Sequence, residues 1–413
     1  MHRATPAALA LTVASALTLT ACGGSGGADV DADAEQTLTV WAMGTEGEKL
    51  AEVAEAYEKS HPNITVKVTP VGWDVAHQKL VAAAAAGKLP DVMQMGGTYL
   101  GEFADMGVLE PVDTTTVKEG DFFPAAWQQA SYDGETYGVP WYVDTRVLFY
   151  RTDLAAKAGL AKPPATTDEL RRAAQAYQDR AKTKWGLSVQ PGGLDTVQSF
   201  YPFLYSAGGE ILTEDGKAVV NSPEAVRALE TYGDFFAKGL SEKSVRPGYD
   251  VTKDFNTGDV PMFLGGPWIM SLLDENYPDI KGKWAVAPVP ADKESVSMAG
   301  GSSLAVSADS EHKAAAKEFI SSLTGARGQS DWYGRTRDLP ANKQAWESGD
   351  LATDPKLKIW REQMETARTT PSHPRLTEIT SKVDAAIESV TQGKSDAKAA
   401  LDKAQSEIEG LVE

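Results

Sequence analysis

Aromatic side chains beside glycine, proline and carboxylate residues are the first candidates for chemistry in this sequence. Trp268 follows Gly265-Gly266-Pro267, a turn that would project the indole from the end of a strand. Trp141 and Tyr142 come just before Asp144. Aromatic rings offer flat apolar faces, and hydrogen bonds to a charged carboxylate contribute roughly 1.5–3 kcal/mol each. This combination suits the non-covalent capture of a molecule with apolar faces and a polar rim.

Simpler roles remain open for the same residues. Trp268 could be an ordinary core tryptophan, and Asp144 could form a structural ion pair with Arg146. Thr45 and Glu46 follow the first expected strand, where the Glu46 carboxylate could equally cap a helix N-terminus.

Cysteine and histidine usage excludes several classes of site. Cys22 is the single cysteine, so neither a disulfide framework nor a thiolate metal cluster is available. The five histidines are scattered without the spacing of a zinc motif, and we expect no metal and no cofactor. Gly23-x-Ser25-x-Gly27 matches the serine-hydrolase elbow only formally, because no strand precedes it and no helix follows. We therefore expect no catalytic residue.

Length and charge limit the class of protein further. A chain of 413 residues exceeds what one hydrophobic core usually serves, so two globular lobes are expected. Forty basic against 58 acidic residues give a net charge of −18. This balance argues against nucleic acid as a partner and against attachment to anionic lipid through charge alone.

The N-terminal residues predict secretion and lipid attachment. Residues 1–21 combine a short positive start with an uncharged apolar run, as in a signal peptide. Leu19-Thr20-Ala21-Cys22 looks like a bacterial lipobox, which predicts acylation of Cys22. Residues 22–35 are rich in Gly, Ser, Ala and Asp and predict a flexible tether. The protein would then sit on the outer face of the bacterial cell membrane. A plain secretory signal with an incidental cysteine is the alternative.

The first part of the folded chain alternates strand and helix. Apolar patterning predicts strands at 37–43, 63–68 and 91–95 and helices at 46–59 and 76–86. This order is typical of a parallel α/β sheet, in which ligands sit beyond the carboxyl ends of the strands. The loops 44–46 and 96–99 are therefore expected where a ligand would lie.

The rest of the chain continues the mixed pattern with more helix. Helices are expected at 168–180 and 222–238, and extended segments at 260–264, 283–289 and 303–306. Residues 356–412 read as amphipathic helix, apart from a break around 369–374.

The order of short motifs resembles the extracellular sugar-binding lipoproteins of carbohydrate ABC transporters, of the maltose-binding type. The motifs are Lys79-Leu80 with Pro90-Asp91-Val92, Gly107 to Val112, Gly134 to Pro140, Asp144 to Tyr150, Gly265 to Trp268 and Gly300-Gly301-Ser302. Each motif is weak alone, but their order covers nearly the whole mature chain.

The resemblance implies the two-lobe periplasmic-binding-protein fold (type II), in which each lobe is a sheet flanked by helices. The lobes would comprise residues 36–145 plus 290–338 and residues 146–289 plus 339–413. Crossing segments near 143–146, 288–302 and 335–340 would act as the hinge that closes the lobes around ligand.

The resemblance also implies a sugar site. A sugar ring presents apolar C–H faces and a rim of hydroxyls, which suit aromatic rings and planar polar groups. In the family a matching tryptophan stacks on sugar at Trp268, and a ligand carboxylate matches Asp144. The full set of expected ligand-binding residues is Thr45, Glu46, Trp73, Gly97, Thr98, Tyr99, Trp141, Asp144, Gln198, Tyr201, Trp268, Gly300, Gly301 and Arg337.

Some members of this set have open alternatives. Trp73 could pack in the core, and a solvated surface role is common for an arginine such as Arg337. Gly300 and Gly301 would bring backbone N–H groups close to a ligand because no side chain intervenes. The maltose binders carry charged residues near Thr98 and Tyr99, and this departure puts strict maltose specificity in doubt.

The expected function is capture of a di- or oligosaccharide and its delivery to ABC transporter permease subunits, by a monomer. A secreted glycoside hydrolase would also use aromatic rings with two carboxylates, about 5–9.5 Å apart. The same fold binding a polyamine, iron or peptide is the other alternative.

Overall fold

The computed structural model describes residues 35–412, except 194 and 245–249. The chain divides into residues 1–35 and a compact unit, Gln36–Glu413. The expected signal segment 1–21, the acylation site Cys22 and almost all of the expected tether lie outside the described residues, so they stay predictions. Within the described part, no helix combines the length and apolarity needed to cross a membrane.

A six-stranded sheet forms the core of the first half of the compact unit, with strand order β11-β6-β10-β3-β1-β2. β1 pairs in parallel with β2 and β3, which confirms the expected parallel start. β10 runs antiparallel to both β3 and β6. The strands are β1 (Gln36–Met43), β2 (Ile64–Val71), β3 (Val92–Gly96), β6 (Val139–Thr145), β10 (Ala299–Val306) and β11 (Leu339–Pro340).

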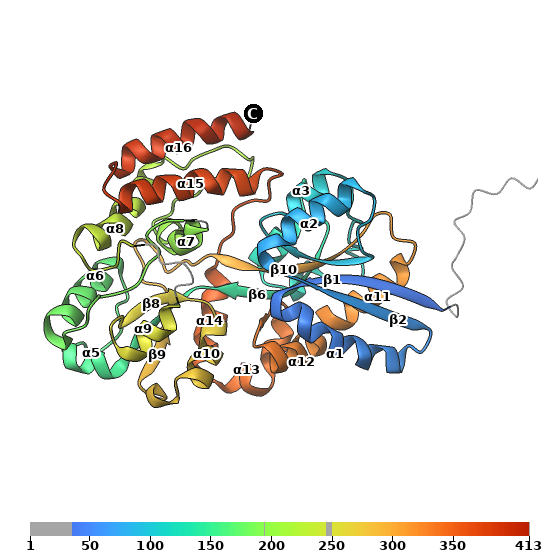
Figure 1. Ribbon diagram of the computed structural model, residues 1–413, viewed down its shortest axis with the longest axis horizontal. Coiled ribbons are helices and arrows are strands. Elements are labelled where there is room, and N and C mark those ends of the chain that lie inside the picture. Colours follow the sequence, from blue (N-terminus) through green and yellow to red (C-terminus); the bar gives the residue numbers. More distant parts are fainter. Residues whose placement is uncertain (1–34, 194, 245–249, 413) are drawn as a thin grey trace, which may run out of the picture. The chain divides into compact units, whose positions relative to one another are not determined.

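Helices cover this sheet with apolar faces (Figure 1). In α1, Leu50, Ala54 and Tyr57 recur at helical spacing and are buried, as the sequence predicted. The expected loop 44–46 is absent, because Gly44 has a φ of 51° and turns the chain directly from β1 into α1. The helices are α1 (Gly44–Ser60), α2 (Trp73–Ala85), α3 (Leu100–Asp105), α4 (Pro124–Gln129), α11 (Lys313–Thr324) and α12 (Ala326–Thr336).

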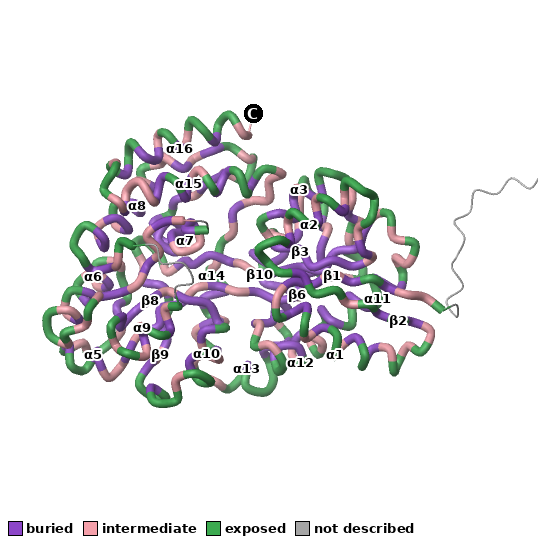
Figure 2. The backbone as a smooth tube through the Cα atoms, viewed as in Figure 1, coloured by how far each residue is buried: buried purple, intermediate pink, exposed green. Residues whose placement is uncertain are grey.

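A three-stranded antiparallel sheet, ordered β8-β7-β9, organises the other half. Its strands are β7 (Val147–Arg151), β8 (Met262–Gly265) and β9 (Trp284–Ala287). The helices around it are α5 (Thr152–Ala158), α6 (Thr167–Ala176), α7 (Thr196–Ser206), α8 (Pro223–Ala237), α9 (Val251–Thr257), α10 (Trp268–Asn276), α14 (Pro355–Thr366), α15 (Leu376–Thr391) and α16 (Ala397–Val412). Figure 2 shows strands buried at the centre of each half and exposed outer faces on the helices.

Several expected helix ends are confirmed. The Ser222 hydroxyl accepts a hydrogen bond from the Ala225 N–H at 3.2 Å and so caps α8, with Pro223 in the first turn. The break expected around 369–374 separates α14 from α15. A small ribbon of β4 (Ser131–Tyr132) and β5 (Glu135–Thr136) and the short helix α13 (Gly349–Thr353) complete the elements that matter here.

The chain passes between the two sheets at the first two places where crossings were expected. β6 and β7 are separated only by Arg146, and residues 288–298 join β9 to β10. The third passage lies later than 335–340, because residues 339–340 still belong to the first sheet. There β11 pairs with β6, and the Trp346 indole N–H donates to the Pro340 carbonyl at 2.9 Å. The bounds given for the two lobes remain a prediction.

Candidate functional site

A cavity of about 1040 Å³ opens at the carboxyl ends of β1 and β3, opposite α7 and α10. Its position matches the expected place for a ligand in a parallel sheet. Most of the expected site residues line it: Thr45, Glu46, Trp73, Gly97, Thr98, Tyr99, Asp144, Gln198, Tyr201, Trp268, Gly300 and Gly301. Two expected residues, Trp141 and Arg337, are not part of its lining.

Glu46 is held on the sheet side of the cavity by a hydrogen-bond network. The Tyr142 hydroxyl donates to Glu46 Oε1 at 2.5 Å. That hydroxyl in turn accepts from the Gln94 amide at 3.2 Å and the Ser302 hydroxyl at 3.2 Å. Burial and the Glu46 charge raise the pKa of Tyr142 well above its ordinary value, so this hydroxyl stays a donor. Gln94 is anchored because its Oε1 accepts from the Met43 N–H at 2.7 Å.

Asp144 makes the expected ion pair and also lines the cavity. Arg146 Nη1 donates to Asp144 Oδ1 at 2.8 Å. The guanidinium also lies 4.9 Å from the centre of the Trp268 ring, which is cation–π distance. Gly300 leaves room for the carboxylate, since a Cβ there would lie 2.5 Å from Asp144 Oδ1. The ion pair with Arg146 is therefore present, and it leaves Asp144 in the lining of the cavity.

Trp268 is the first residue of α10 and leaves the indole 42 % exposed. The ring lies back over Gly266, where a Cβ would come within 1.9 Å of it. A core role for Trp268 is therefore wrong, and Gly266 fixes where the ring lies. Trp73 is likewise 44 % exposed at the start of α2, so it is not a core residue either.

Two stacked tyrosines of α7 form the opposite side of the cavity. The rings of Tyr201 and Tyr205 lie 5.1 Å apart at 10°. The Thr370 hydroxyl donates to the Tyr201 hydroxyl at 3.2 Å and lies 2.9 Å from that of Tyr205. The Asp384 carboxylate accepts the Val197 N–H at 2.7 Å at the start of α7. Hydrogen bonds thus hold the hydroxyl groups of both tyrosines and the start of the helix that carries them.

The expectation for Trp141 is wrong as to contact with a ligand. Its indole is fully buried, 4.5 Å from the ring of Trp332. Successive side chains of a strand point to opposite faces, so Tyr142, not Trp141, reaches the cavity from β6.

The structure places Arg337 outside the lining of the cavity, and its contact with a ligand stays a prediction. It ends α12 in the left-handed conformation, with a φ of 66°, and its guanidinium lies 5.1 Å from the Tyr333 ring. Its neighbours Thr336 and Asp338 line the cavity instead.

Residues that the sequence did not single out include Asp338, Tyr205, Arg368 and Thr370, which all line the cavity. Tyr142 was noticed but not assigned a role, although strand alternation could have selected it over Trp141. The segment 335–340 was expected as a crossing between the lobes, with Arg337 as its ligand-binding residue, and no pattern identified Asp338 within it. Burial, with the Glu46 charge second, raises the pKa of Asp338 to about 7.

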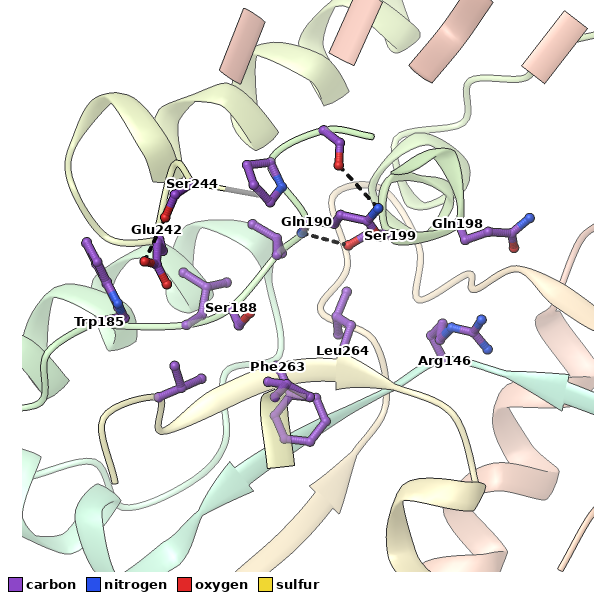
Figure 3. A pocket seen from close by; sticks show the side chains of 16 residues that line it. Arg146, Trp185, Ser188, Gln190, Gln198, Ser199, Glu242, Ser244, Phe263 and Leu264 are labelled. Atoms are coloured by element: carbon purple, nitrogen blue, oxygen red, sulfur yellow. Dashed lines mark hydrogen bonds between the residues drawn. The ribbon is translucent and has the colours of Figure 1, made fainter. Parts of the chain in front are cut away.

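A second cavity of about 450 Å³ lies beside the first (Figure 3). Arg146 and Gln198 lie at one end of it, and Trp185 and Glu242 lie at the other. Gln198 lines both cavities. Ser244, the last described residue before 245–249, also lines this cavity.

Known proteins are similar to this chain in both sequence and fold. The galactooligosaccharide-binding protein of Bacillus subtilis is 26 % identical over 389 residues, which is 91 % of this chain and 89 % of that protein. The diacetylchitobiose-binding protein DasA of Streptomyces coelicolor is 28 % identical over 88 % of this chain and 87 % of its own length. The solved structure of the sugar-binding protein MalE of Xanthomonas citri superposes with a TM-score of 0.84 at 30 % identity, covering 91 % of this chain and 97 % of MalE.

These likenesses confirm the expected fold class, a mixed α/β protein with the two-lobe architecture of periplasmic binding proteins. The family model for bacterial extracellular solute-binding proteins matches residues 42–330, which contain both sheets except β11 and the first six residues of β1. The chain therefore belongs to the family of bacterial extracellular solute-binding proteins.

Proposed function

We propose that this protein captures a carbohydrate of two or more sugar units outside the cell and delivers it to the permease of an ABC importer. The observation that carries the proposal is the composition of the large cavity. Exposed Trp73 and Trp268 and the stacked tyrosines offer flat apolar surfaces. Glu46 and Asp144 offer fixed hydrogen-bond acceptors for hydroxyl groups. About 1040 Å³ is enough space for more than one sugar ring.

The relatives support the same ligand class. Their names give galactooligosaccharide, diacetylchitobiose and sugar as ligands. Several aromatic contacts and hydrogen bonds, less the costs of association, are consistent with micromolar binding, or about −8 kcal/mol.

In this proposal the protein binds without catalysis. Glu46 accepts a hydrogen bond from Tyr142, and Asp144 accepts one from Arg146. These fixed carboxylates then act as acceptors of hydroxyl hydrogen bonds from the ligand. The two lobes close around the ligand by torsion at the passages between the sheets, of which Arg146 is the shortest. The protein acts as a monomer, and acyl chains on Cys22 hold it at the outer face of the cell membrane, each contributing roughly 0.8 kcal/mol per buried methylene.

A thermal-shift screen with α- and β-linked oligosaccharides tests the proposal. A hundredfold excess of ligand over its dissociation constant should stabilise the protein by about 2.7 kcal/mol. Chromatography of the same samples should show the sugar unchanged, whereas a glycoside hydrolase would yield shorter products. Stabilisation by spermidine or ferric iron, with none by any sugar, would contradict the carbohydrate assignment. Mass spectrometry of the membrane fraction would show whether Cys22 carries lipid.

A further inference from the structure

Acidic side chains outnumber basic ones around the large cavity. Among the described residues that line it, the acidic ones are Glu46, Asp74, Asp144, Asp195 and Asp338, and the basic one is Arg368. Neutral hydroxyls need acceptors, but they do not need this excess of acidic over basic side chains. The cavity therefore repels an anionic ligand and attracts a cationic one.

Glu46 and Asp338 are the two carboxylates of this set that are enclosed without a counter-charge. Asp144 has Arg146, whereas no ion pair between described residues includes Glu46 or Asp338. Glu46 is 9 % exposed and accepts from the Tyr142 hydroxyl. Asp338 accepts from the Trp332 indole N–H at 3.1 Å. Enclosed charges of like sign are unfavourable, so a proton or a bound cation has to replace one of the two negative charges.

A buried hydroxyl and an exposed ring line the same cavity, and the ring lies near Glu46. Tyr99 is 8 % exposed, and its hydroxyl has no hydrogen-bond partner although the residue lines the cavity. The Trp73 indole and Glu46 Oε2 both lie against Gly44, since a Cβ there would be 2.8 Å from the ring and 3.3 Å from the oxygen. An exposed indole next to a carboxylate is a good environment for an ammonium group.

We infer that the cavity takes a carbohydrate carrying a protonated amine, with the ammonium between Glu46 and Asp338 and against the Trp73 ring. This inference rests on the proposed function and adds the charge class of the sugar to it. An organic cation fits better than a metal ion, because no group of three His, Cys, Asp or Glu side chains in the described part of the chain could hold a metal.

Three β-1,4 disaccharides that differ at carbon 2 test the inference on the full chain. Cellobiose carries a hydroxyl there, chitobiose a protonated amine at pH 6, and N,N′-diacetylchitobiose a neutral amide. Calorimetry should show chitobiose binding at least about tenfold more tightly than either neutral sugar, with the preference weakened by salt. Because the ammonium displaces a proton from Asp338, the binding enthalpy of chitobiose should depend on the buffer, whereas that of cellobiose should not.

Two matched variants test which carboxylate produces the preference for chitobiose. Asp338→Asn keeps the size of the side chain and should reduce the preference for chitobiose over cellobiose about tenfold. Asp74→Asn removes one charge from an exposed lining residue and should change the preference by less than threefold. A melting curve of each variant confirms that it folds.

The outcomes separate the two proposals. Binding of either neutral disaccharide as tightly as chitobiose would overturn the inference and uphold the proposed function. Equal effects of Asp338→Asn and Asp74→Asn would also overturn it, because the preference would then reflect only the overall field. Binding of none of these sugars, nor of any in the wider screen, would overturn both.

Discussion

The two sides of the large cavity are built in different ways. The strand wall comprises Glu46 in the first turn of α1, Tyr142 and Asp144 of β6, and Asp338 just before β11. The helix wall comprises Gln198, Tyr201 and Tyr205 of α7 and Trp268 of α10. The strand wall holds charge through a hydrogen-bond network, whereas the helix wall offers stacked rings.

This difference separates two tasks of recognition. Carboxylates fixed by neighbours impose direction on a ligand, because a hydrogen bond weakens steeply when its angle is poor. Aromatic rings tolerate sliding of an apolar face and contribute mainly buried area. The strand wall should therefore decide which sugar binds, and the helix wall should add affinity for many sugars.

Trp141→Ala should have the largest effect, and it should act on stability. The indole is fully buried behind the strand wall, against Trp332. Replacing it leaves a cavity, so we expect a loss of about 3–5 kcal/mol in the free energy of unfolding. Denaturant unfolding measures this loss. A stable variant with weakened sugar binding would contradict the placement of Trp141 in the core.

Asp338→Asn should raise stability at high pH, which probes the strand wall directly. Burial and Glu46 raise the pKa of Asp338 to about 7, above the value near 4 expected for an unfolded chain. The folded state thus holds a proton that the unfolded state releases between about pH 4 and pH 7, and native stability falls as pH rises through this window.

The variant lacks this loss, so it should be more stable than the native protein by as much as about 4 kcal/mol above pH 7. The gain should vanish near pH 4, where Asp338 is protonated in both states. Thermal melts at pH 4, 6 and 8 measure it, with Asp74→Asn as the exposed control. A gain that is equal at all pH values would contradict the raised pKa of Asp338.

Trp268→Ala should weaken binding by about tenfold for any bound sugar, since one aromatic contact contributes roughly 0.5–1.5 kcal/mol beyond buried area. Stability should change little, because the indole is 42 % exposed. Titration calorimetry with the best sugar from the screen measures the loss. If the variant lost one sugar but kept another of the same length, the helix wall would contribute selectivity as well as affinity.

The sequence predicted the strand wall and the helix wall with different success. The strand–helix order located Thr45 and Glu46, because the carboxyl ends of parallel strands meet at one edge. On the same wall, reading Trp141 instead of Tyr142 was an error of one residue, which reverses the face of a strand. Asp338 was missed because its approach depends on the late passage after β11, which involves contacts distant in sequence.

The helix wall depended more on resemblance than on local pattern. Gln198 and Tyr201 were named because a family region matched them, and both line the cavity. Thr370, which joins the two tyrosines, lies about 170 residues further along the chain. No local pattern could indicate that contact. Trp268 was the exception, because the preceding glycines and proline already predicted an exposed indole.

Arg337→Gly should have the smallest effect and tests whether this position belongs to either wall. Arg337 ends α12 with a φ of 66°, a conformation that glycine adopts without strain. Removing the strain while losing the ring contact with Tyr333 should change stability by less than about 1 kcal/mol. Sugar affinity should stay the same, because the side chain is exposed outside the cavity. A several-fold loss of affinity by calorimetry would place Arg337 in the strand wall after all, beside Asp338.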